Sequence, residues 1–156
     1  MDIANPSLDF RRIIRLSLIC AAIALCVSLP FGALIHYLFG NSAAAEEQVS
    51  SNKWLFFVMS IFIAPFLETY IIVICNIVLE NTDKAKKLVI SSLVFALVHF
   101  VADIEKVLSV AIPAVVFCYG YYYLGRTRKE SYWIAATTHF IHNLVVVSIA
   151  VIFVGN

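Results

Sequence analysis

Charged residues are scarce in this chain of 156 residues. Asp, Glu, Lys and Arg together make up 13% of the sequence, whereas hydrophobic residues make up 62%. Soluble globular proteins carry about twice that share of charge, so the composition excludes an ordinary soluble domain. We therefore expect an integral membrane protein with the length of one helical domain.

Two further absences exclude classes of partner and of cofactor site. The formal net charge is only +1 and no basic stripe is present, so no nucleic-acid partner is expected. Cys20, Cys26, Cys75 and Cys118 lie in apolar runs and form no Cys-x-x-Cys pair. Because this placement is typical of small buried hydrophobic residues, neither a disulfide framework nor a cysteine zinc site is expected.

The chain does contain a series of apolar runs suited to a lipid bilayer. A helix rises about 1.5 Å per residue, so roughly 20 residues cross a hydrocarbon core about 30 Å thick. The runs predict an all-α, polytopic transmembrane helical bundle of about five spans. Residues 1–53 are expected to form an N-terminal span and polar loop, and residues 54–156 a four-helix membrane core. The predicted spans lie near residues 13–39, 54–79, 88–101 (which is short), 107–124 and 132–154.

The basic residues predict how the bundle is oriented. Nine of the eleven Lys and Arg residues lie in or beside residues 1–12, 81–87 and 125–131, which five spans place on one side. Cytoplasmic loops of membrane proteins carry an excess of Lys and Arg. The N-terminus is therefore expected to be cytoplasmic, in a multi-pass protein of the cytoplasmic (inner) membrane.

Four polar side chains lie inside the predicted spans: Glu68, His99, His139 and Asn143. An ionisable group at bilayer depth costs about 2.5 kcal/mol or more, so such residues indicate a functional site. Counted from the end of each span that adjoins the Lys- and Arg-rich segments, Glu68, His99 and Asn143 all lie roughly 18 Å deep. His139 is four residues before Asn143 and thus shares its helical face. Three helices are therefore expected to bring their rare polar groups to one level.

This set of side chains has the groups needed to hydrolyse an amide bond. A carboxylate and an imidazole on adjacent helices can hold and deprotonate a water molecule. A second imidazole and a carboxamide can donate hydrogen bonds to an oxyanion. We expect water to reach such a site from the cytoplasmic side.

The same residues carry a family resemblance. Ala64-Pro-x-x-Glu68, Phe95-x-x-x-His99 and His139-x-x-x-Asn143 resemble the three ordered motifs of the CAAX-protease and bacteriocin-processing (Abi, or type II CAAX protease) family of intramembrane proteases. The resemblance covers about residues 54–150. It implies that Glu68 activates water with His99 as its partner, and that His139 and Asn143 form the oxyanion site.

The first motif departs from the family pattern at two positions. Thr69 stands where the family has a second Glu, and Val73 where it has an Arg. Two functions therefore stay open. One is an intramembrane endopeptidase acting on a peptide or membrane-protein substrate. The other is a catalytically inactive membrane subunit that binds and stabilises a partner membrane protein.

Cofactors are not required by this pattern. Two His and one Glu from three helices would suit a zinc site with an open position, but the sequence lacks His-Glu-x-x-His and the residues can work without a metal. No cofactor is expected, with zinc as one alternative and haem ligation by His99 and His139 as another. His142, three residues after His139, could line the same cavity, but packing within the bundle is the favoured expectation.

Overall fold

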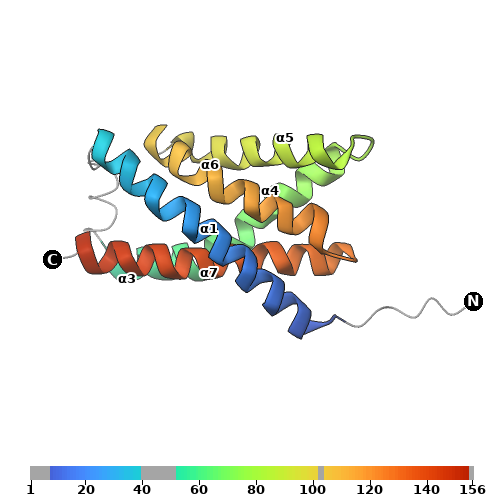
Figure 1. Ribbon diagram of the computed structural model, residues 1–156, viewed down its shortest axis with the longest axis horizontal. Helices are drawn as coiled ribbons and strands as arrows, with labels where there is room; N and C mark the ends of the chain where they lie inside the picture. Colours follow the sequence, from blue (N-terminus) through green and yellow to red (C-terminus); the bar gives the residue numbers. More distant parts are fainter. Residues whose placement is uncertain (1–7, 40–51, 102–103, 155–156) are drawn as a thin grey trace, which may run out of the picture.

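The chain folds into a bundle of helices, with no strand in the part that the structure describes (Figure 1). A computed structural model describes residues 8–39, 52–101 and 104–154. Apolar runs become helices because a bilayer offers no partner for backbone N–H and C=O groups, and a helix pairs them within its own segment. The predicted all-α bundle is confirmed. The elements are α1 (Phe10–Phe39), α3 (Lys53–Val58), the π-helix η1 (Met59–Ile63), α4 (Ala64–Val78), α5 (Lys84–Leu97), the 3-10 helix η2 (Val98–Val101), α6 (Ile104–Tyr119), the π-helix η3 (Gly120–Leu124) and α7 (Arg128–Val154).

Among the described residues, four helical stretches are long and apolar enough to cross a membrane: Phe10–Ile35, Trp54–Val78, Lys106–Leu124 and Arg128–Ile152. The remaining predicted span is α5, with 14 α-helical residues that continue into η2. Its α-helical part is about 21 Å long, which is less than the hydrocarbon thickness. A count of about five spans fits this arrangement, with α5 as the short member.

The helices pack around a small core (Figure 1). α1 lies across α6 and α7, α5 runs beside α6, and α4 contacts both α5 and α7. Ser17 on α1 is fully buried and donates a hydrogen bond to the Ile134 carbonyl at 3.1 Å. The buried core cluster comprises Ala24, Ile72, Phe95, Ala114, Phe117, Cys118, Tyr121, Tyr122 and Ala135.

Large apolar side chains are exposed on all the long helices. Examples are Ile14, Leu67, Leu93, Val115 and Ile149. Monomeric soluble proteins rarely expose contiguous apolar patches of more than a few hundred Å². A surface of this kind fits surrounding lipid, as the composition predicted.

The basic segments gather at one end of the bundle, called here the basic end. The start of α1, the α4–α5 turn and the α6–α7 turn lie there, while α3 and α6 begin at the opposite end (Figure 1). Asp83 caps α5 by accepting a hydrogen bond from the Lys86 N–H at 2.9 Å. Gly125 permits the α6–α7 turn because a Cβ at this position would lie 2.5 Å from the Ser131 nitrogen. Which side of the membrane the basic end faces stays a prediction.

Candidate active site

The carboxylate of Glu68 lies against two imidazoles from other helical elements. Its Oε2 is 3.5 Å from Nε2 of His99 and 3.7 Å from Nε2 of His139. Glu68 comes from α4, His99 from η2 and His139 from α7. The Glu68 side chain is 26% exposed and that of His139 only 5%, so the cluster is mostly but not fully enclosed. The structure thus brings together three of the four polar residues that were predicted to share one level.

The backbone sets which nitrogen of His99 carries a proton. Nδ1 lies 2.9 Å from the carbonyl oxygen of Phe95, one turn earlier. A carbonyl only accepts, so Nδ1 is the donor, and Nε2 faces the Glu68 oxygen, with which it can exchange a proton. The ring also stacks on Phe95 at a centroid distance of 5.6 Å. His99 is therefore oriented as a proton-transfer partner of the carboxylate.

His139 is held by aromatic rings rather than by hydrogen bonds. Its ring stacks on Phe117 at 4.5 Å and meets the edge of Phe95 at 5.5 Å. Nδ1 is buried without a hydrogen-bond partner among the described residues. The Glu68 carboxylate near Nε2 favours the neutral tautomer with its proton on Nε2, because a carboxylate is an acceptor. His139 consequently presents an N–H donor to the cluster.

A π-helix precedes the turn that carries Glu68. In η1 the Ala64 N–H donates to the Met59 carbonyl, five residues back. The Ser60 carbonyl would pair with residue 65 in the same pattern, but Pro65 has no N–H. The amide nitrogen of Asn143 fills that place, donating to the Ser60 oxygen at 2.9 Å. Asn143 therefore ties α7 to the irregular stretch just before Glu68.

His142 links the site to the first helix. Its Nδ1 lies 3.4 Å from the Asn143 side-chain oxygen, which only accepts, so Nδ1 is the donor. Its Nε2 then accepts from the buried Ser28 hydroxyl of α1 at 2.9 Å. The ring also meets the edge of Phe117 at 5.5 Å. His142 packs as expected and in addition orients the amide of Asn143.

A cavity of about 200 Å³ adjoins these groups. A water molecule occupies about 30 Å³ in the liquid, so the cavity has room for several. Beyond the polar cluster its wall continues to Phe56, to the exposed Lys106 at the start of α6, and to Val147 late in α7. α3, the start of α6 and the last turns of α7 lie at the end of the bundle opposite the basic end (Figure 1). The cavity therefore extends away from the basic end, and the approach of water from the cytoplasmic side stays a prediction. The lining residues are Phe56, Ser60, Ala64, Glu68, His99, Lys106, Val110, Pro113, Phe117, His139, His142, Asn143 and Val147.

Sequence reasoning missed Ser60, Lys106 and Phe117 as parts of the site. Ser60 had little signal in the sequence, because it stands eight residues before Glu68, about 80° away around an α-helix, and contacts Asn143 through its backbone carbonyl. Lys106 was assigned to the loop between spans, and Phe117 had no distinguishing mark within its apolar run. Within the described residues no group of three or more His, Cys, Asp or Glu side chains is arranged to hold a metal ion. A metal-free site stays a prediction.

Comparison with protein-family models assigns the chain to a family. The model of the type II CAAX prenyl endopeptidase Rce1-like family matches residues 50–145, which is more than half of the sequence. The chain belongs to this family. Neither the curated proteins nor the solved structures searched give a match. Membership of the Rce1-like family places the chain among CAAX-type intramembrane proteases in general terms.

At the two positions that depart from the family pattern, this Rce1-like chain has side chains that pack within the bundle. Thr69 is 1% exposed, and its hydroxyl donates to the Pro65 carbonyl at 2.6 Å. Val73 packs against the core cluster. The hydroxyl of Thr69 thus has its hydrogen-bond partner within its own helix. With Thr and Val in place of the Glu and Arg of the pattern, these positions hold no charge and no unpaired side-chain group.

Proposed function

We propose that the chain is an intramembrane endopeptidase in which Glu68 and His99 activate a water molecule. The observation that carries this proposal is the approach of two imidazole Nε2 atoms to one Glu68 oxygen within 4 Å, beside a cavity. A water molecule in the cavity that contacts both the Glu68 carboxylate and Nε2 of His99 would give a proton to Glu68 while the water oxygen attacks the peptide carbonyl. The proton would then pass to the leaving amine as the C–N bond breaks, which balances the hydrolysis.

The developing oxyanion needs donors, and two are at hand. His139 presents its Nε2 proton, and the Asn143 amide has a second N–H besides the one given to Ser60. Removing one such donor in a hydrolase costs about 10²- to 10³-fold in kcat. In this proposal one N–H of Asn143 binds the Ser60 carbonyl, and the other N–H helps to bind the oxyanion.

Water and substrate would enter from the Lys106 end of the bundle. This assignment is supported by the course of the cavity, whose wall reaches the exposed Lys106. If the basic end is cytoplasmic, the site opens toward the opposite face of the membrane. Labelling of cysteines placed at the two ends of the bundle tests this orientation.

The decisive experiment is cleavage by purified protein reconstituted in liposomes. The substrates are prenylated peptides ending in a CAAX sequence and a pooled set of single-span membrane peptides, with fragments identified by mass spectrometry. Glu68→Gln should reduce turnover by about 10²-fold or more, since the base is lost while the shape is kept. Glu80→Gln, on the exposed α4–α5 turn, is the matched control and should retain full turnover. Cleavage that survives Glu68→Gln in a folded protein would overturn the mechanism.

A second function is favoured by one observation, the packing of Thr69 and Val73 where the family pattern has two charged residues. We propose as the alternative a non-catalytic subunit that binds and stabilises a partner membrane protein. A partner that co-purifies with wild type and with Glu68→Gln alike, while wild type cleaves none of the peptides, would support it. Peptide cleavage that depends on Glu68 would exclude it.

A further inference from the structure

A second hollow, separate from the Glu68 cavity, lies at the basic end of the bundle. Its volume is about 540 Å³. It is formed between the first turns of α1 and the turn that precedes α7. Its lining consists of four arginines with one carboxylate and two apolar side chains: Arg11, Arg12, Arg15, Arg126, Asp9, Leu16 and Ile19.

The positive charge of this hollow exceeds the negative charge available to balance it. Arg12 is paired with the Glu130 carboxylate, which is buried. Asp9, the carboxylate in the lining, accepts a hydrogen bond from the backbone N–H of Arg12 at 3.1 Å. Arg11 and Arg15 are exposed and have no carboxylate partner among the described residues. The hollow therefore offers guanidinium groups to an anion.

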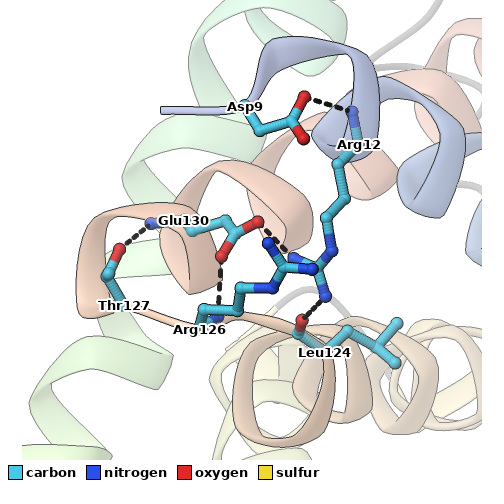
Figure 2. Close-up of polar contacts among 6 residues, drawn as sticks. All are labelled: Asp9, Arg12, Leu124, Arg126, Thr127 and Glu130. Carbon is cyan, nitrogen blue, oxygen red and sulfur yellow. Dashed lines mark hydrogen bonds and ion pairs between the residues drawn. The ribbon is translucent and has the colours of Figure 1, made fainter. Parts of the chain in front are cut away.

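The frame around the hollow is rigidly built (Figure 2). Arg12 donates to the Leu124 carbonyl at 2.7 Å in addition to its ion pair with Glu130. The other Glu130 oxygen accepts from the Arg126 backbone N–H at 2.7 Å, and Thr127 accepts from the Glu130 N–H at 3.1 Å. The first turn of α1 and the α6–α7 turn are thus joined, which holds the hollow in shape before any ligand arrives.

The lining changes from charged to apolar along α1. Arg11, Arg15 and Ile19 follow one another at four-residue spacing and share one helical face, and Leu16 lies beside them. The charged part lies at the end of the span and the apolar part lies toward its middle. Guanidinium groups bind phosphate through two parallel hydrogen bonds, and an acyl chain prefers an apolar wall.

We propose that this hollow binds the phosphodiester headgroup of an anionic phospholipid, whose acyl chain lies along Leu16 and Ile19. Basic hollows between transmembrane helices suit such headgroups, and anionic lipids are enriched in the cytoplasmic leaflet. The apolar continuation distinguishes a lipid from free phosphate. The proposal is independent of catalysis at Glu68.

The test measures lipid binding to the purified full chain in detergent. Phosphatidylglycerol should raise the Tm and stay bound in native mass spectrometry, whereas phosphatidylcholine should do neither. Arg11→Gln with Arg15→Gln should weaken phosphatidylglycerol binding about 30-fold, since each Arg near an anionic lipid contributes about five-fold. Both residues are exposed, so the variant is expected to fold. Arg128→Gln with Lys129→Gln is the matched control, because these exposed residues lie at the same end but outside the hollow.

Each remaining outcome would overturn the lipid assignment. An equal Tm rise with inorganic phosphate alone would show a free-phosphate site. Equal loss of binding in both double variants would show only a general attraction of the basic end for anions. Phosphatidylglycerol binding that is unchanged by Arg11→Gln with Arg15→Gln would remove the hollow as its location, and displacement of the lipid only by an acidic peptide would point to a protein ligand.

Discussion

At the scale of single residues, the two ring nitrogens of His99 make different contacts. Nδ1 donates to the Phe95 carbonyl, while Nε2 faces Glu68 at 3.5 Å. The first contact stabilises the end of α5, and the second belongs to the proposed chemistry. Because they use different atoms, a substitution can remove one and keep the other.

We predict that His99→Asn folds normally but cleaves peptide far more slowly than wild type. The Asn amide nitrogen can replace Nδ1 as donor to Phe95, whereas nothing replaces Nε2 beside Glu68. Turnover should fall about 10²- to 10⁴-fold, which is the usual contribution of a general acid–base partner. The checks are the cleavage assay and the Tm of the purified variant. A variant with unchanged turnover would show that His99 only supports the helix end.

The sequence predicted which polar residues would meet but not how each is held. Depth counting and the spacing of His139 and Asn143 were sufficient to group Glu68 with its neighbours. The bond from Asn143 to Ser60 could not be foreseen, because it exists only where a π-helix and Pro65 leave a carbonyl unpaired. The stacking of His139 on Phe117 depends likewise on how α6 and α7 pack.

At the scale of elements, the π-helix η1 makes Asn143 and Pro65 energetically dependent on each other. Asn143→Ala leaves the Ser60 carbonyl without its donor, which should reduce the free energy of unfolding by about 1–3 kcal/mol. Pro65→Ala restores an N–H five residues after Ser60. We predict that Asn143→Ala costs about 1 kcal/mol less in the Pro65→Ala background than in wild type.

This coupling is measured by a double-mutant cycle of denaturant unfolding in detergent micelles. Thr138→Val, in the turn of α7 before Asn143, is a suitable comparison because its hydroxyl bonds only the Ile134 carbonyl of its own helix. Its cost should be the same with Pro65 or with Ala at residue 65. Additive costs for Asn143→Ala would mean that another group satisfies Ser60.

The ion pair of Arg12 with Glu130 is one of the contacts that join the first helix to the rest of the bundle. Their side chains are 24% and 6% exposed, so the pair is shielded from solvent on one side. Glu130→Gln should lower the free energy of unfolding by about 1–2 kcal/mol, because Arg12 loses its counter-charge but can still reach water. Lys129→Gln, an exposed neighbour, should change it by less than about 0.5 kcal/mol. Unfolding of both variants in detergent tests this, and equal values would show that the pair contributes nothing.

The apolar runs predicted the long helices well, because length and hydrophobicity alone decide whether a segment can span a bilayer. They did not predict the breaks in them. η1, η2 and η3 replace α-helical turns beside Pro65, around His99 and after Tyr119. Pro65 marks the first of these places in the sequence, because proline removes a backbone donor, whereas the hydrophobicity of the runs carries no such signal.

At the scale of the whole molecule, the charge distribution and the cavity give opposite ends of the bundle different properties. The positive-inside rule assigns the basic end to the cytoplasm. The Glu68 cavity extends toward Lys106 at the other end. For the proposed endopeptidase, orientation therefore determines which compartment would supply water and substrate.

We predict that Lys106→Cys and Arg126→Cys are labelled from opposite sides of the membrane. Both side chains are exposed, and they belong to the start of α6 and to the α6–α7 turn, which lie at opposite ends of the bundle (Figure 1). In intact cells a membrane-impermeant maleimide should label Lys106→Cys, and Arg126→Cys only after permeabilisation. The background variant replaces all four native cysteines, since Cys26 is exposed. The reverse pattern would place the basic end outside and the cavity toward the cytoplasm.

The contact of α1 with the site has a practical consequence for expressing this protein in parts. The family match begins at residue 50 and leaves α1 out. Without α1, His142 loses Ser28, the Ile134 carbonyl loses Ser17, and Glu130 loses Arg12. A fragment that begins at residue 50 would expose these polar groups to lipid or detergent. It would be unsuitable for inhibitor screening even though it contains all three motifs.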